Sequence, residues 1–228
     1  MRKLILAILL LAPLAACKTI PPSTGHISLK RYPDALSGNQ NEAKIPGKYL
    51  IYIGSESARF GISYPNAVPC KFSIDKDRII AAELLSGLRE LIGKTFESFD
   101  IRLGLPDKIS VERGYDDVFL VSPMAAGATL TGSEALKNYF TGPEARVFHV
   151  ISNFDFRVKQ TGGYGGNPVT FVKERFSRDI KPVNTLDPKT ACPSLSREIA
   201  DVASTSYHSG LNELGQTLRR LVEERKSS

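Results

Sequence analysis

The chain has 228 residues, of which 42% are hydrophobic and 24% are charged, and its formal net charge is +6. This length suits one domain with a tail or two small domains, and the apolar content is enough for a hydrophobic core. The small basic excess is compatible with attraction to anionic lipid headgroups, but the chain contains no dense run of lysine and arginine of the kind that a polybasic membrane patch needs.

The first sixteen residues have the pattern of an export signal. Arg2 and Lys3 are followed by an unbroken apolar run at residues 4–11, which Pro13 ends. A membrane-spanning helix needs about 20 apolar residues, so this run is too short to cross a bilayer. We therefore expect residues 1–16 to be a cleaved signal peptide. Because export separates the protein from nucleic acid, nucleic acid is not an expected partner.

The residues at the predicted cut, Leu14-Ala15-Ala16-Cys17, resemble the lipobox of bacterial lipoproteins at all four positions. The resemblance implies diacylglycerol on the Cys17 thiol and a fatty acid such as palmitate on the new amine, and several acyl chains make a stable membrane anchor. Lys18 replaces the aspartate that tends to retain lipoproteins in the inner membrane. The resemblance thus implies the outer membrane, with the domain facing the periplasm. The alternative is an ordinary signal peptide with a chance cysteine at the cut.

Residues 17–47 are rich in proline, serine, glycine, asparagine and lysine and show no apolar period. This composition predicts a flexible tether with a reach of roughly 30 Å. Residues 48–228 are then expected to form one domain. Its first strand is predicted at residues 49–53, where an apolar run without alternation indicates burial on both faces.

The middle of the chain alternates between strand and helix patterns. Apolar residues at helical spacing from Ile80 to Ile92 predict an amphipathic helix that begins near Asp75 or Asp77 and reaches Phe96. Strands are expected at residues 59–62, 70–74, 99–103, 108–111 and 118–122, and a short helix at residues 133–140.

The last third predicts a hairpin and a long helix. Apolar residues alternate from Phe148 to Val158, and a second strand at residues 169–176 follows a glycine-rich turn. Residues 180–193 are expected to be irregular, with a helix from Ser194 or Ser196 to the end that kinks or starts later at residues 204–206. The elements predict an α+β fold, in which an internal amphipathic helix and a long C-terminal helix pack on an antiparallel or mixed sheet.

Two cysteines remain besides Cys17. In an oxidising compartment Cys70 and Cys192 are expected to form a disulfide, with two buried free thiols as the alternative. The three histidines show no ligand spacing with these cysteines, so no metal site is expected.

The glycine-rich turn is the most conspicuous local motif. Strands flank it and no Gly-Lys-Ser/Thr follows, so it does not fit a phosphate-binding loop. We interpret Gly163, Tyr164 and Gly165 as a mobile hairpin tip, or as a contact loop in which Tyr164 anchors a partner.

Catalytic patterns are missing from the sequence. No serine lies in a nucleophile elbow. His149 is expected to face solvent, and His208 is expected to be either solvated or packed within the last helix. Asp116-Asp117 is interpreted as a loop or turn, because adjacent residues of a strand point to opposite faces. We expect no catalytic residue and no cofactor.

The order of these segments over residues 17–224 resembles small periplasmic accessory lipoproteins, such as the lipopolysaccharide-assembly lipoprotein and the auxiliary lipoproteins of ABC-type lipid transporters. The resemblance implies a non-enzymatic accessory or structural subunit of an envelope assembly or transport complex, with an envelope protein as partner. No functional residue is carried over. The alternatives are a module that binds a lipid or small ligand between sheet and helix, and an enzyme of unrecognised type.

Overall fold

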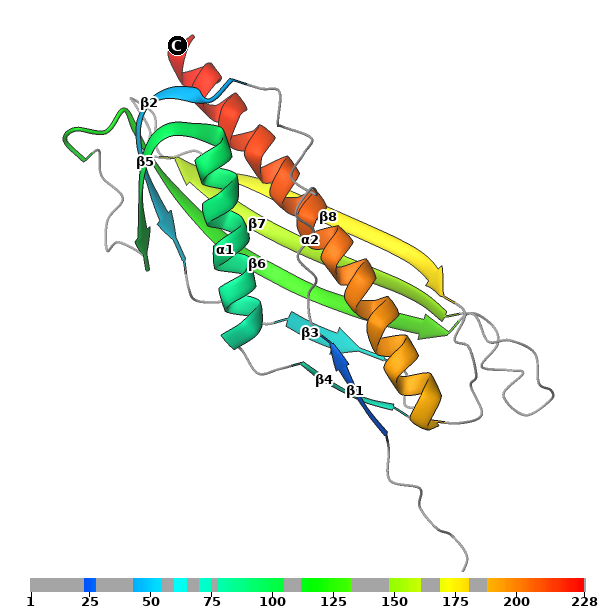
Figure 1. Cartoon of the computed structure of the whole chain (residues 1–228). Helices are drawn as coiled ribbons and strands as arrows, with labels where there is room; N and C mark the ends of the chain where they lie inside the picture. The colour runs from blue at the N-terminus through cyan, green and yellow to red at the C-terminus, as the bar shows by residue number, and fades with distance from the viewer. Residues whose placement is uncertain are drawn as a thin grey trace, which may run out of the picture.

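The protein is a mixed β-sheet with two helices packed on one face (Figure 1). The computed structural model describes residues 23–27, 43–54, 60–64, 70–74, 78–104, 112–132, 148–160, 169–180 and 188–227. Its elements are β1 Ser23–Ile27, β2 Ile45–Ile53, β3 Phe60–Ser63, β4 Cys70–Ile74, α1 Arg78–Thr95, β5 Phe96–Leu103, β6 Asp117–Gly132, β7 Phe148–Gln160, β8 Val169–Ile180 and α2 Pro188–Lys226. The predicted α+β class is confirmed, and the sheet is mixed.

The main sheet has six strands in the order β5-β2-β6-β7-β8, with β3 paired to β6. Strand β2 is parallel to both β5 and β6, whereas β7 is antiparallel to its two neighbours, β6 and β8. The predicted hairpin is therefore β7–β8. The expected strand at residues 108–111 and the expected helix at residues 133–140 lie outside the described residues.

Alternation along the strands divides the sheet into two faces. In β7 every second residue from Phe148 to Gln160 is buried, and the others are partly exposed. The buried set packs with α1 and α2 in the main core, on what we call the helix-side face. Leu50 and Tyr52 of β2 point the other way into a second small core, which agrees with the predicted burial of this strand on both faces. We call this opposite side the open face.

Helix α2 is longer than the sequence predicted. It begins at Pro188, so the expectation of an irregular segment up to residue 193 is wrong. Proline at the first position of a helix loses no hydrogen bond and has its φ already set. Burial of Cys192 and Leu195 and a hydrogen bond from the Ser196 hydroxyl to the Cys192 carbonyl (2.8 Å) hold the early turns.

The predicted late start at residues 204–206 is also wrong, because α2 runs through this segment without interruption and the hydroxyls here have partners. Those of Ser204 and Thr205 donate to carbonyls one turn back. The hydroxyl of Ser206 donates to the Ser152 carbonyl of β7 (3.1 Å) and so ties the helix to the sheet. These bonds satisfy the polar groups that would otherwise compete with the helical backbone.

The two helices approach closely at Gly87 of α1. A Cβ added at Gly87 would overlap the hydroxyl of Tyr207 and lie 2.9 Å from a methyl group of Leu211, and both neighbours are buried. Gly93 of the same helix has room, since its nearest atoms belong to Phe99 at 3.7 Å.

We expect Gly87→Ala to lower the free energy of unfolding by about 1–3 kcal/mol, because overpacking exceeds the helix-propensity gain of about 1 kcal/mol. Gly93→Ala is the matched control and should stabilise the protein by up to about 1 kcal/mol, since it gains the propensity alone. Urea unfolding of both variants measures the difference. Equal stabilisation by the two substitutions would contradict the close approach of α1 and α2.

Strand β1 corrects the predicted tether. Residues 23–27 pair in parallel with β4 and lie within the range 17–47, so the tether prediction is wrong for them. A Cβ on Gly25 would overlap the Ser196 hydroxyl, and Ile27 is buried in the main core. The sequence shows no strand pattern here because the partners that bury this segment lie far along the chain. The main sheet likewise starts at Ile45, ahead of the predicted residue 48.

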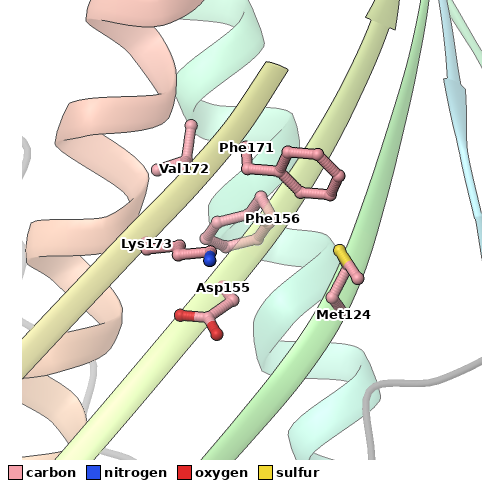
Figure 2. A pocket seen from close by; sticks show the side chains of 6 residues that line it. All are labelled: Met124, Asp155, Phe156, Phe171, Val172 and Lys173. Carbon is pink, nitrogen blue, oxygen red and sulfur yellow. The ribbon is translucent and has the colours of Figure 1, made fainter. Parts of the chain in front are cut away.

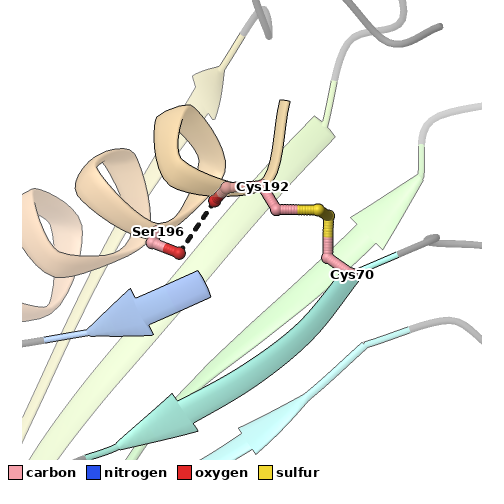
Figure 3. The surroundings of a disulfide bond; sticks show 3 residues. All are labelled: Cys70, Cys192 and Ser196. Carbon is pink, nitrogen blue, oxygen red and sulfur yellow. Dashed lines mark hydrogen bonds between the residues drawn. A yellow bond between two sulfur atoms is a disulfide. The ribbon is translucent and has the colours of Figure 1, made fainter. Parts of the chain in front are cut away.

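Cys70 and Cys192 form a disulfide, as the sequence predicted (Figure 3). Their Cα atoms are 5.5 Å apart and 122 positions separate them in sequence. Both side chains are buried. The bond fastens the two-stranded sheet of β1 and β4 to the first turns of α2.

Candidate functional site

The open face gathers exposed apolar side chains. Met124, Val169 and Phe171 are 45%, 46% and 53% exposed, and they are three of the four exposed large hydrophobic residues in the described part of the chain. The fourth, Leu103, ends β5. Clustered apolar exposure on a sheet face indicates a contact surface, whereas single exposed side chains are common on any protein.

Met124 and Phe171 line a shallow hollow of about 220 Å³ (Figure 2). The Phe171 ring is directed across β7 toward Met124, and Asp155 and Lys173 lie beside them. Met124 is placed here by an irregularity in β6, where the register with β7 shifts between residues 123 and 125. A bulge of this kind redirects a side chain relative to regular alternation.

Charged side chains share the open face with the hollow. In the β7–β8 register Arg157 is opposite Phe171, and Lys159 is opposite Val169. Lys173 follows on the same face of β8, opposite Asp155. The hollow is smaller than the 300–1,000 Å³ typical of whole small-molecule sites. Its size suits one apolar side chain or the end of one acyl chain, and its charged lining residues are one aspartate and one lysine, Asp155 and Lys173.

A polar cluster covers the other end of the open face. Tyr52 of β2 donates a short hydrogen bond to Glu112, and Arg102 of β5 donates to Tyr52 (3.0 Å) and to both oxygens of Glu112 (2.9 and 3.0 Å). The hydrogen bond to Glu112 raises the pKa of Tyr52, and the bond to Tyr52 raises the pKa of Arg102.

A second part of the cluster lies beside it. Tyr115 donates to Asp100 (2.6 Å), Lys48 lies 3.3 Å from the same carboxylate, and its ammonium group lies 4.8 Å from the centre of the Tyr115 ring. The bond to Asp100 raises the pKa of Tyr115, while the bonds from Tyr115 and Lys48 lower the pKa of Asp100. Because these groups satisfy one another, we interpret the cluster as a clamp that holds residues 112–116 on the sheet.

The clamp predicts a response to alkaline pH. A tyrosine whose pKa is higher in the folded than in the unfolded state binds its proton more tightly when the protein is folded. Its contribution to the free energy of unfolding is full below about pH 10 and is lost as pH rises through the folded pKa. We therefore expect Tyr52 to ionise at a higher pH than an ordinary tyrosine. Subtracting the absorbance titration of Tyr52→Phe at 295 nm from that of the wild type isolates the signal of Tyr52. A difference curve centred at or below pH 10 would contradict the bond to Glu112.

A third feature lies where β6 begins. Asp117 is buried, pairs with Arg225 of α2 and accepts hydrogen bonds from the Val118 amide (2.8 Å) and the Gln160 side chain. The carboxylate of Asp116 instead accepts a bond from the Lys48 amide (2.6 Å). The prediction of a loop or turn therefore holds for Asp116 and is wrong for Asp117, because a distant helix supplies the cation that allows its burial.

These residues border a second hollow of about 450 Å³. Its lining residues are Pro46, Gly47, Tyr49, Asp116, Asp117, Val222, Arg225 and Lys226. Gly47 has φ 117°, a left-handed conformation that favours glycine, and a Cβ there would lie 2.5 Å from an Asp116 oxygen. Burial raises the pKa of Tyr49 on this wall. Asp117 and Arg225 pair on this wall and fasten the end of α2 to the sheet.

The remaining sequence-based candidates are distributed over the molecule. Cys17 and the tip residues Gly163, Tyr164 and Gly165 lie outside the described residues. His149 is partly exposed on the open face, with Nδ1 2.8 Å from an Asp179 oxygen, and His208 is buried in α2. The described ranges contain no group of three potential metal-ligating His, Cys, Asp or Glu side chains and no helix long and apolar enough to cross a membrane.

Sequence reasoning missed both the hollow and the clamp. Alternation showed which residues of β7 share a face, but Met124 and Tyr52 contribute through strand register, and only the tertiary structure brings Glu112 to Tyr52 and Arg102. Alternation in β8 places Phe171 on the same face as Lys173, Arg175 and Asp179, and this aromatic residue among charged ones was the available signal for the hollow.

No protein-family model matches the chain, and no curated protein matches it in sequence. Solved structures similar to it include a neuraminyllactose-binding hemagglutinin homolog from Helicobacter pylori, at 11% identity and TM-score 0.44 over 84% of this chain and 92% of that chain. Rare lipoprotein B from Shewanella oneidensis gives 16% identity and TM-score 0.42 over 76% and 98% of the two chains. A minor lipoprotein from Acinetobacter baumannii gives 9% identity and TM-score 0.34 over 81% of this chain and 96% of that chain. At TM-scores below 0.5, no residue or activity is transferred from these proteins.

Proposed function

We propose that this chain is a lipid-anchored envelope lipoprotein and a non-enzymatic accessory subunit that docks an envelope protein on its open face. The observation that carries the proposal is the hollow between Met124 and Phe171, with Val169 beside it, on the sheet face opposite α1 and α2. Exposed aromatic and methionine side chains are enriched at protein interfaces, where a few of them supply most of the binding free energy.

The anchor is the second part of the proposal. Leu14-Ala15-Ala16-Cys17 supports acylation of Cys17, and Lys18 supports sorting to the outer membrane. Several acyl chains hold a protein firmly to one bilayer. An anchored subunit with an accessible docking face stays near a membrane partner without spanning the membrane itself.

We expect Phe171→Ser to weaken binding of the partner about 30-fold, the effect of losing about 2 kcal/mol at an interface anchor. The matched control is Leu103→Ser, which removes an equally exposed apolar side chain at the end of β5 and should leave binding unchanged. The measurement is quantitative pull-down of the acylated protein from envelopes solubilised in mild detergent, with Cys17→Ala testing whether anchoring is required for co-purification.

The outcomes separate the proposal from its alternative. A partner lost with Phe171→Ser but retained with Leu103→Ser supports docking on the open face. Equal retention by both variants contradicts it. If the intact protein carries no partner but retains lipid that Phe171→Ser releases, the hollow instead holds an acyl chain and the chain is a ligand-binding module.

A further inference from the structure

The distance between the lipidated cysteine and folded structure is short. Only residues 18–22 separate Cys17 from Ser23, the first residue of β1. A fully extended chain advances at most about 3.6 Å per residue, so the Cα atom of Cys17 lies within about 22 Å of that of Ser23. Under the proposed anchor, whichever part of the domain holds β1 is therefore close to the bilayer.

Strand β1 lies at one end of the molecule, beside the disulfide. Ser23 is the register partner of Cys70, which is bonded to Cys192. A Cβ on Gly25 would lie 3.0 Å from the Cys192 carbonyl. Figure 1 shows β1 and β4 next to the start of α2, with the C-terminus at the opposite end of the helix. We call β1, β4 and the first turns of α2 the disulfide end.

Helix α2 extends far beyond the reach of this linker. Its 39 residues span about 58 Å at 1.5 Å per residue. It runs antiparallel to β8, since Glu198 pairs with Arg178 and the Ser209 hydroxyl donates to Glu174. Ser209 is already about 25 Å along the helix from Cys192. Phe171 lies beyond Glu174 in the same direction, so the hollow is remote from the disulfide end.

We infer that the disulfide end is the membrane-facing end of the domain and that α2 projects away from the bilayer, which places the hollow beyond the lipid headgroups. The inference rests on the proposed anchor at Cys17. Exposed Lys71 and Lys189 lie within three residues of the bonded cysteines, and cations at this end suit a surface of anionic headgroups. The occupant of this end is then an anionic lipid surface, whereas the hollow is left for a protein.

The sequence contains no tryptophan, so one introduced tryptophan reports a single position. We would place the acylated full chain, carrying Lys71→Trp, Phe171→Trp or Lys226→Trp, on vesicles of phosphatidylethanolamine and phosphatidylglycerol with dansyl-labelled headgroups. Energy transfer from tryptophan to dansyl is expected to be strong for Lys71→Trp and to fall to background for the other two. Arg197→Trp, exposed in the early turns of α2, replaces Lys71→Trp if that variant does not fold.

Equal transfer from all three positions would show the domain lying flat on the bilayer and would overturn the inference, as would stronger transfer from Lys226→Trp. Sedimentation of the same vesicles tests the anchor separately, with Cys17→Ala as the unlipidated control. A chain that sediments with the vesicles but shows the reversed transfer order refutes the orientation alone. A chain that does not sediment refutes the anchor, and the orientation with it.

Discussion

Replacing Cys70 and Cys192 together with serine should lower the free energy of unfolding by about 5 kcal/mol, the loop-closure entropy of a long cross-linked segment. The size follows from the 122 positions that the bond spans. Because both thiol positions are buried, the serine hydroxyls add a further cost of placing polar groups in the core. Urea unfolding under oxidising conditions, compared with wild type, measures the loss.

Reduction gives the matched control for this prediction. Dithiothreitol should shift the unfolding midpoint of the wild-type protein toward that of the double variant and leave the variant itself unchanged. Hydrogen exchange should rise first in β1, β4 and the early turns of α2, because these are the elements that the bond joins. A double variant with the stability of the oxidised wild type would show that the bond does not constrain the chain in solution.

Arg225→Met should destabilise the protein by about 3 kcal/mol, because it removes the cationic partner of a buried carboxylate. The side chain of Asp117 is only 3% exposed, whereas that of Arg225 is 35% exposed, which places the expected loss at the lower end for a broken buried pair. Methionine keeps most of the apolar stem of arginine, so the change is mainly one of charge. Thermal or urea unfolding at neutral pH measures the effect.

The matched control lies on the same part of the helix. Arg220 pairs with Glu224, and their side chains are 57% and 63% exposed, so Arg220→Met is expected to cost less than about 0.5 kcal/mol. Adding Asp117→Asn to Arg225→Met should recover part of the loss, since the carboxylate charge is then gone. Similar losses from Arg225→Met and Arg220→Met would contradict a buried ion pair at Asp117.

Together these variants test how α2 is held at its two ends. A covalent bond at Cys192 fixes the first turns to β4, and Asp117 fixes the last turns to β6. Between them, Ser206 and Gly210 bring the helix close to β7. A helix fastened in this way gives the sheet a rigid covered side, so the docking surface proposed on the other side is held in a fixed shape.

Local periodicity in the sequence determined the elements that carry their own pattern. Apolar spacing located α1, alternation located β7, and the glycine-rich turn between two strands indicated the β7–β8 hairpin. The α+β class followed from the order of the predicted elements, and the pair Cys70 and Cys192 followed from an even number of remaining cysteines in an oxidising compartment. These features can be predicted because each depends on residues close together in the chain or, for the disulfide, on the oxidising compartment that both thiols share.

Only the tertiary structure decided the features that depend on distant partners. Strand β1 forms because β4 and α2 bury it, and Asp117 is tolerated inside because Arg225 arrives from the far end of the chain. Alternation assigns residues to two faces, but packing of the helices decides which face is covered. Met124 and Phe171 are therefore left on the open face by the placement of α1 and α2, which no local pattern in their own strands specifies.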